Sequence, residues 1–241
     1  MEIIPAIDII NGKCVRLTQG DFDQKIIYND DPLVVAKQFE EAGLTRVHLV
    51  DLDGAKAGQV TNIHVLENIA KNTSLKIDFG GGIKTEEDVV KILEAGADMV
   101  SIGSLAAKNP LLLEEWIDKY GEAKFMIGAD VLNGTIRISG WTEEVEIGIF
   151  EFIYNMVGIG VVNIFCTDIS ADGMMNGPSL KLYAEIIERF RNIKLIASGG
   201  VSKIEDVFQL KAMGCAGAII GKAIYEQKIT LGELIAVNKE P

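Results

Sequence analysis

The sequence contains one local pattern twice, once in each half. Residues 8–12 are Asp-Ile-Ile-Asn-Gly and residues 130–134 are Asp-Val-Leu-Asn-Gly, and each pentapeptide follows an apolar run. The correspondence continues downstream, where Gly81-Gly82 in the first half matches Gly199-Gly200 in the second. Two units of this length are too long and too few for a solenoid, whose repeats are shorter and more numerous. The pattern predicts a barrel built from two duplicated half-barrels.

Short apolar segments alternate with amphipathic ones along the whole chain. The expected strands are residues 3–7, 46–50, 75–79, 99–102, 125–129, 161–165, 194–197 and 218–220. The expected helices are residues 32–42, 63–71, 86–95, 110–119, 147–157, 180–189, 204–213 and 223–237. Buried parallel strands are short and uniformly apolar, because helices cover one face and the barrel interior fills the other. This alternation predicts an α/β fold, the (βα)8 TIM barrel; an open doubly wound sheet explains the repeat less economically.

Length and composition narrow the class of protein. At 241 residues with no linker-like tract, the chain is expected to form one domain over residues 1–241. Its 23 Lys and Arg against 35 Asp and Glu give a net charge of −12, which disfavours nucleic-acid binding. The N-terminus lacks the pattern of a secretory signal, and no apolar stretch reaches the ~20 residues of a membrane span. A cytoplasmic protein that binds neither membrane nor nucleic acid is expected.

The cysteines favour a reducing compartment and no metal site. Cys14, Cys166 and Cys215 are odd in number, far apart, and show no Cys/His ligand spacing. The sequence therefore predicts neither a disulfide framework nor a bound metal.

Two aspartates are the first candidates for catalysis. In a (βα)8 barrel the active site forms at the carboxyl ends of the strands, and Asp8 and Asp130 follow the expected first and fifth strands. The half-to-half repeat then places them on opposite sides of the barrel mouth. Alternatively, each could be a turn residue that bonds to its own loop, assisted by the following Asn-Gly. The symmetric pair favours catalysis.

Glycines at strand ends predict phosphate binding. Gly199-Gly200 and Gly221-Lys222 end the expected seventh and eighth strands, where many barrels bind phosphate. Gly81-Gly82 and Gly103-Ser104 hold the corresponding places after strands three and four. Backbone amides at the start of a helix favour an anion there. Two such sites predict a ligand with a phosphate at each end.

Three polar residues follow the second and sixth strands. Asp51 follows strand two, and Thr167-Asp168 follows strand six, in symmetry-related places at the rim. Each could contact a ligand or simply cap its own loop.

Four further side chains admit both a functional and a structural interpretation. Trp141 could close over a flat ring or cap the barrel rim. Arg16 and Lys84 could meet ligand charge or be solvated, and His48 is a binding candidate that could equally be a packed strand histidine.

The combined motifs resemble a known family. They are Ile4–Asp8, Gly12–Leu17, Gln19–Asp21, Val50–Ala55, Gly80–Ile83 and Asp172-Gly173. From the first strand to the last, the chain resembles the phosphoribosylformimino-5-aminoimidazole carboxamide ribotide isomerases of histidine biosynthesis. The resemblance implies a duplicated (βα)8 barrel and an Amadori rearrangement of an aminoaldose to an aminoketose, an intramolecular oxidoreduction on a bisphosphate substrate. It implies no metal, no coenzyme and no obligate protein partner, and we expect a monomer.

The resemblance also implies roles for individual residues. Asp8 is the general base, Asp130 the general acid, and Thr167 a supporting group, as ring opening and enolisation require. The expected substrate and phosphate contacts are Arg16, His48, Asp51, Gly81, Gly82, Lys84, Gly103, Ser104, Trp141, Gly173, Gly199, Gly200, Gly221 and Lys222.

Three positions depart from the commonest family pattern. Lys84 stands where arginine is frequent, which replaces a two-pronged phosphate grip with a point charge. Met174 replaces a usual threonine, and Ser139 a usual charged residue. These departures affect ligand contacts rather than the reaction.

Three alternative functions remain. The cyclase subunit of imidazole-glycerol-phosphate synthase shares barrel and repeat, but its first strand usually has Cys-Leu-Asp where this chain has Ala6-Ile7-Asp8. Phosphoribosylanthranilate isomerase uses a cysteine base on the first strand, whereas Cys14 lies six residues past Asp8. A noncatalytic phosphosugar-binding barrel would not need two opposed carboxylates, although fold alone does not exclude it.

Overall fold

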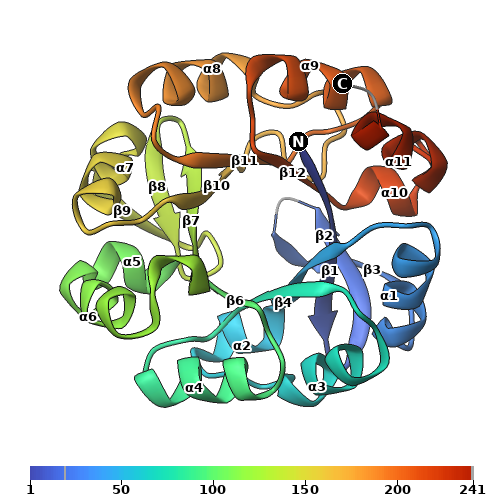
Figure 1. The fold of residues 1–241 in the computed structure, drawn as a ribbon, viewed down its shortest axis with the longest axis horizontal. Coiled ribbons are helices and arrows are strands. Elements are labelled where there is room, and N and C mark those ends of the chain that lie inside the picture. The colour runs from blue at the N-terminus through green and yellow to red at the C-terminus, as the bar shows by residue number, and fades with distance from the viewer. Residues whose placement is uncertain (19, 240–241) are drawn as a thin grey trace.

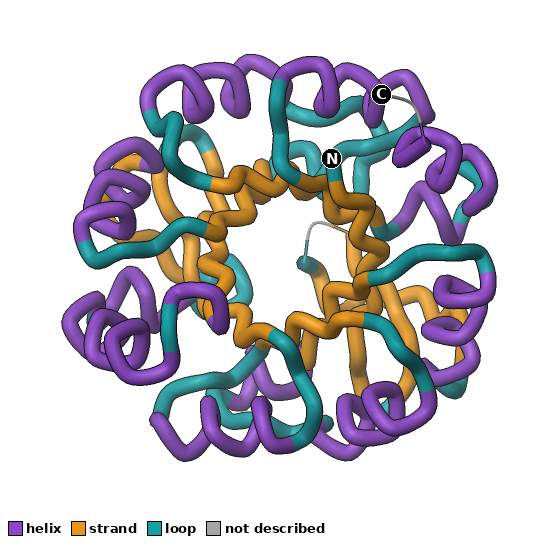
Figure 2. The backbone as a smooth tube through the Cα atoms, in the orientation of Figure 1, coloured by secondary structure: helices purple, strands orange, loops and turns teal. Residues whose placement is uncertain are grey.

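The strands close into a parallel barrel. A computed structural model describes residues 1–18 and 20–239; Gln19, part of the motif at 19–21, lies outside the described residues. The barrel strands are β1 (Glu2–Ile10), β4 (Arg46–Asp51), β5 (Lys76–Gly80), β6 (Met99–Ile102), β7 (Phe125–Leu132), β10 (Asn163–Asp168), β11 (Lys194–Ser198) and β12 (Gly217–Ile220). They pair in parallel in this order, and β12 pairs with β1 to close the ring. Figures 1 and 2 show this ring of strands inside a ring of helices. The predicted (βα)8 barrel is confirmed.

The helices follow their strands with recognisable start signals. They are α1 (Pro32–Glu41), α2 (Leu52–Ala57), α3 (Ile63–Asn72), α4 (Glu86–Glu94), α5 (Ser104–Lys108), α6 (Pro110–Tyr120), α7 (Ile149–Gly158), α8 (Leu180–Arg189), α9 (Ile204–Met213), α10 (Lys222–Tyr225) and α11 (Leu231–Lys239), with a 3-10 turn η1 (Glu122–Lys124). Pro32 and Pro110 occupy first-turn positions, where a missing N–H costs nothing. The helix predicted over 223–237 was wrong in its middle, because Gln227 takes a left-handed backbone (φ 55°) and separates α10 from α11.

Two pairs of consecutive β-hairpins, which were not predicted from the sequence, extend beyond the barrel. One is formed by β1 with β2 (Lys13–Thr18) and β3 (Asp21–Asn29), the other by β7 with β8 (Thr135–Ile138) and β9 (Glu143–Gly148). Their first turns are Asn11-Gly12 (φ 51° and 72°) and Asn133-Gly134 (φ 53° and 86°). The helix predicted from residue 147 therefore begins only at Ile149.

The hairpins change where the candidate aspartates lie. Asp8 and Asp130 were expected just after strand ends, but β1 and β7 continue into the hairpins, so both residues lie within strands. Asp8 is opposite Val15 of β2 on one side and Val50 of β4 on the other. The backbone of Asp8 is thus held by neighbouring strands on both sides, and that of Asp130 pairs with Thr167 of β10.

The core has two layers. A large cluster between strands and helices includes Phe79, Trp116, Phe152 and Tyr183. A small apolar cluster occupies part of the barrel interior: Ile4, Ala6, Met126, Ile196 and Ile219, with Met99 and Phe165 packed against it. Alternate residues of each strand point inward, as expected for a filled barrel.

The two halves share backbone conformations as well as sequence. Gly103 (φ −104°, ψ −87°) matches Gly221 (φ −114°, ψ −94°), and each precedes a short helix. Gly81-Gly82 (φ 114° and 81°) matches Gly199-Gly200 (φ 88° and 80°). The repeat seen in the sequence therefore recurs in the local geometry of the strand ends.

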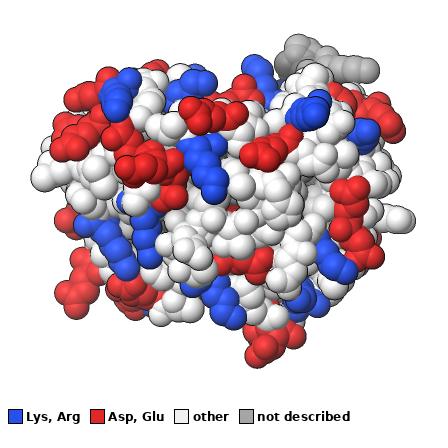
Figure 3. All heavy atoms as spheres, turned by 90° about the horizontal axis from the view of Figure 1, so that it is seen from below, with Lys and Arg blue, Asp and Glu red and all other residues white. Residues whose placement is uncertain are grey.

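Within residues 1–18 and 20–239, no helix has the length and apolar character to cross a bilayer. On the face shown in Figure 3, Lys and Arg side chains are interspersed with Asp and Glu rather than gathered in one patch.

Candidate active site

Asp8 lies at the barrel mouth in a buried ion pair. Its Oδ2 is 2.9 Å from Nη1 of Arg16, and the two side chains are only 13% and 12% exposed. Burial raises the pKa of Asp8, while the charges of Arg16 and His48 act in the opposite direction. Asp8 is therefore a desolvated carboxylate with one fixed cationic partner, which suits a general base.

Asp130 lies on the opposite side of the mouth. Three strands, β4, β5 and β6, separate β7 from β1, and three more separate them the other way round. The Trp141 indole Nε1 donates to Asp130 Oδ2 at 2.9 Å, and the neighbouring Thr167 hydroxyl also bonds to this carboxyl group. Burial raises the pKa of Asp130, and these hydrogen bonds partly offset it. A carboxyl group with raised pKa can hold a proton for donation.

A third carboxyl group, Asp172, reaches the same space. Burial raises its pKa; the charges of Arg16 and Lys222 oppose this, and those of Asp8 and Asp130 add to it. In the sequence, Asp172 stands out only as part of a motif with Gly173. The structure therefore brings together three acids where two were predicted.

A pocket lies where the seventh and eighth barrel strands end. Lys222 Nζ donates to the Gly173 carbonyl at 2.9 Å across this pocket. A Cβ on Gly221 would overlap the Arg16 guanidinium, so glycine is required for Arg16 to lie there. The pocket is lined by Arg16, Asp172, Gly173, Met175, Ser198, Gly199, Gly200, Val201, Ile219, Ile220, Gly221 and Lys222. The predicted second-half phosphate residues are thus adjacent in space.

The first-half glycines have a similar place, and Gly81 and Gly82 lie close to other backbone atoms, whereas Gly103 is open. A Cβ on Gly81 would overlap the Asp51 carbonyl, and one on Gly82 would lie 2.6 Å from Gln59. Lys84 places its Nζ against Gly58, at the end of α2.

The long helices after the glycine pairs already carry acidic caps. Asp88 accepts from the Lys84 and Thr85 amides at the start of α4, and Asp206 accepts from the Ser202 and Lys203 amides at the start of α9. These carboxylates occupy the amides just before the two helices, so the predicted phosphate contact remains a prediction for the other amides of these turns. The amides of the glycines themselves and of the short helices α5 and α10 are the alternative.

Ser139 and Met174, the other two positions that depart from the family pattern, differ in their surroundings. Ser139 (φ 56°) donates its amide to Ser104 Oγ at 2.9 Å and its hydroxyl to Glu143 at 3.0 Å, which fastens the β8–β9 turn to the first-half site. Met174 is exposed.

Asp51 and Asp168 serve their own loops in this structure. The fully buried Asp51 accepts hydrogen bonds from Gly54, Thr61 and Asn62. Asp168 accepts from Ser170 and Ser179. Both carboxylate oxygens of Asp51 thus already accept hydrogen bonds from backbone and side-chain amides, which disfavours the expected contact with a ligand.

His48 also lies below the rim. It is 7% exposed, and its Nδ1 contacts Asp78 of β5 inside the barrel. The structural interpretation of His48 as a packed strand histidine fits this position, and the sequence analysis did not identify Asp78.

The carboxyl groups of this site can transfer protons, whereas the thiol of Cys14 is not favoured as a base. Burial raises the pKa of Cys14 to about 11, and its Sγ contacts the Tyr225 hydroxyl at 3.4 Å. Among the residues the structure describes, no group of three His, Cys, Asp or Glu could hold a metal ion. Opposed carboxyl groups at the barrel mouth, beside the pocket at the ends of strands seven and eight, suit acid–base chemistry on a small ligand.

Comparisons with known proteins point in one direction. The profile of the family described as "Histidine biosynthesis protein" matches residues 2–230. The chain is similar to proteins named 1-(5-phosphoribosyl)-5-((5-phosphoribosylamino)methylideneamino)imidazole-4-carboxamide isomerase. The Flavobacterium psychrophilum protein is 53% identical over 234 residues, 97% of each chain. The Bacteroides thetaiotaomicron protein is 51% identical over 234 residues, 97% of this chain and 98% of its own.

Proposed function

This chain belongs to the histidine biosynthesis protein family, and from that premise we propose that it catalyses the isomerisation for which its relatives are named. The reaction is the Amadori rearrangement of the N-(5-phosphoribosyl)formimino aminoaldose to the phosphoribulosyl aminoketose. The observation that carries the proposal is the pair of buried carboxyl groups, Asp8 and Asp130, on opposite sides of one barrel mouth.

The proposed mechanism assigns one proton transfer to each side. Asp130 donates a proton to the ribose ring oxygen, the C1–O bond breaks, and a Schiff base forms at C1. Asp8 then removes the C2 proton, which gives an enolamine that tautomerises to the aminoketose. Thr167 holds the Asp130 carboxyl group, and Arg16 holds Asp8.

Asp172 competes with Asp130 for the role of acid. Burial raises the pKa values of both, and both residues are half-buried. The hydrogen bonds from Trp141 and Thr167 fix Asp130 in one orientation, which supports its assignment. Comparing Asp130→Asn with Asp172→Asn decides this: the variant that loses the alkaline limb of the kcat/KM profile has lost the acid.

We propose that the substrate spans the mouth with one phosphate in each half. The second-half cradle consists of Gly199, Gly200, Gly221 and Lys222, the first-half cradle of Gly81, Gly82, Gly103, Ser104 and Lys84, and their matched dihedral angles support the pairing. A crystal soaked in a bisphosphate product analogue should show density at both cradles; density at one alone would contradict a two-phosphate ligand.

The deciding experiment is an assay of the purified chain with the aminoaldose in EDTA, without glutaminase, ammonia or nucleotide. Formation of the aminoketose supports the proposal, including its independence of metal, coenzyme and protein partner. Failure to isomerise, with ammonia-dependent cyclisation of the aminoketose, would indicate the sister synthase instead. Binding of both compounds without conversion would indicate a noncatalytic barrel. We also propose that the protein is cytoplasmic, one domain and a monomer.

A further inference from the structure

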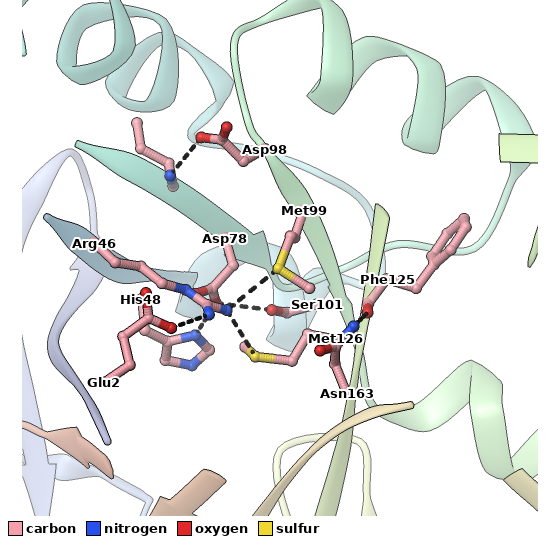
Figure 4. Close-up of polar contacts among 11 residues, drawn as sticks. Glu2, Arg46, His48, Asp78, Asp98, Met99, Ser101, Phe125, Met126 and Asn163 are labelled. Carbon is pink, nitrogen blue, oxygen red and sulfur yellow. Dashed lines mark hydrogen bonds and ion pairs between the residues drawn. The ribbon is translucent and has the colours of Figure 1, made fainter. Parts of the chain in front are cut away.

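A polar cluster fills one side of the barrel interior below the mouth (Figure 4). At its centre is Asp78 of β5, which is fully buried. It accepts from Arg46 Nε at 3.1 Å and from Ser101 Oγ at 2.9 Å, and it contacts His48 Nδ1. Arg46 Nη1 also pairs with Glu2 at 2.8 Å.

This cluster is unusual for its position. The rest of the same interior is apolar, with Ile196, Ile219 and Phe165, as branched side chains commonly are in a filled barrel. Buried ion pairs are weak contributors to stability, because desolvation offsets their attraction. An ionic cluster here therefore calls for an explanation other than stability.

His48 is the member that lies nearest the reacting groups. It pairs in register with Ala6, two residues before Asp8 on the adjacent strand. Its ring lies edge-on to Phe165 at 5.3 Å, and Phe165 precedes by two residues Thr167, which is opposite Asp130. Residues two apart in a strand point the same way. His48 therefore lies one interior layer beneath both carboxyl groups, and no described residue bonds to its Nε2.

We propose that Asp78, braced by Arg46, holds His48 as an imidazolium beneath the mouth, where its positive charge sets the pH range over which Asp8 and Asp130 work. This inference rests on the proposed isomerase function and adds His48 and Asp78 to it as positioning residues. Asp78 bonds to Nδ1, which requires a proton there, and a charged ring carries a second proton on Nε2.

The electrostatics of the neighbouring groups agree with this geometry. Burial dominates the raised pKa values of Asp8 and Asp130, and the His48 charge acts against burial at both. For Asp78, burial acts to raise the pKa, but the charges of His48 and Arg46 together with its hydrogen bonds lower it.

Other charged groups face these sites from every side. Glu2 and Arg46 lie beneath the imidazole. Arg16 and Asp172 act on Asp8, and Asp172 also interacts with Asp130. Replacing His48 alone leaves these residues in the chain, so a shift of the pH profile reports the loss of the His48 charge and of its pairing with Asp78.

The test compares His48→Gln with His64→Gln, which removes the other histidine, an exposed residue of α3. Removing a cation favours the protonated form of both carboxyl groups. Both limbs of the bell-shaped kcat/KM profile should therefore move to higher pH, by on the order of one pH unit. The profile of His64→Gln should match that of the wild type. If His48 has only a structural role, His48→Gln would lower the maximal kcat/KM without moving either limb of its pH profile. That result would overturn the proposal.

A second measurement does not depend on the folding of the His48 variant. With ¹⁵N-histidine labelling, the ring signals come from only two imidazoles, and His64→Gln shows which of them belong to His48. In the wild type, both ring nitrogens of His48 should be protonated at the pH of maximal activity, and Asp78→Asn should remove that state. A neutral His48 in the wild type contradicts the inference even if the isomerase assay succeeds. A doubly protonated His48 in a chain without isomerase activity would instead count against the proposed function.

Discussion

At the scale of single residues, the Asp8 carboxylate has the most demanding role. Asp8→Asn keeps the shape and one hydrogen-bonding oxygen for Arg16 but cannot accept the C2 proton. We expect kcat/KM to fall on the order of 10²- to 10⁴-fold while ligand binding persists. Steady-state kinetics measure the fall in kcat/KM, and the rise in the thermal unfolding temperature on adding ligand measures binding. The matched control is Asp118→Asn on the exposed face of α6, which should retain full activity. A near-wild-type rate for Asp8→Asn would remove it from the base role.

Trp141 should affect the pKa of the general acid, Asp130, and leave the pKa of the general base, Asp8, unchanged. Its indole N–H stabilises the ionised form of Asp130, so Trp141→Phe should raise the pKa of Asp130. The alkaline limb of the kcat/KM profile should then move to higher pH, by less than about one unit, while the acid limb stays fixed. The fixed limb is an internal control. Movement of both limbs would show that Trp141 acts on the whole site rather than on Asp130.

Some site residues could be predicted from the sequence and others could not. Asp8 and Asp130 were found because the repeated pentapeptide marks them directly. Asp78 was missed because, in a strand of mostly apolar residues, nothing local shows that its side chain faces inward toward Arg46 and His48. Their pairing depends on the register between β4 and β5, which only the closed barrel provides.

At the scale of elements, Gly128 in β7 shows how tightly the interior is filled. A Cβ there would lie 2.6 Å from the Phe165 ring. Gly128→Ala should lower the free energy of unfolding by about 1–3 kcal/mol, because the ring has to move within a packed barrel. Denaturant titration with an unchanged m-value would show this.

The control for that substitution is Gly158→Ala. Gly158 ends helix α7, and its Cβ would meet nothing within 4 Å. Alanine there should be neutral or stabilise by a few tenths of a kcal/mol. If Phe165 is the obstacle, Phe165→Leu should restore part of the stability lost in Gly128→Ala. Simple additivity of the two substitutions would contradict this explanation.

The barrel strands were predictable as elements, whereas the hairpins were missed. The eight barrel strands are apolar runs, and each lay within a few residues of its predicted range. The strands β3 and β9 are exposed or half-buried along their length and carry only short apolar stretches, so no long apolar run marks them. Asn-Gly is nevertheless a strong hairpin signal, because both residues accept positive φ. Asn11-Gly12 and Asn133-Gly134 adopt such angles, so the signal was present in the sequence.

At the scale of the whole molecule, the closed ring predicts that the two halves unfold together. The chain has two tryptophans, Trp116 in the first half and Trp141 in the second. In Trp141→Phe, fluorescence reports on the first half alone, and in Trp116→Phe on the second. Within each variant, the fluorescence midpoint in denaturant should coincide with that of far-ultraviolet circular dichroism. Separate midpoints would show that the half-barrels are independent folding units.

Closure also decides where another chain could add to the sheet. A ring in which β12 pairs with β1 has no free border, so the outermost strands of the hairpins, β3 and β9, are where unpaired backbone groups remain. In β9, Glu143, Glu144 and Glu146 oppose the approach of a second strand through their charge. In β3, the exposed Ile26 and Ile27 give weaker protection. Intermolecular strand addition, and with it aggregation of the native barrel, should therefore begin at β3 rather than at β9.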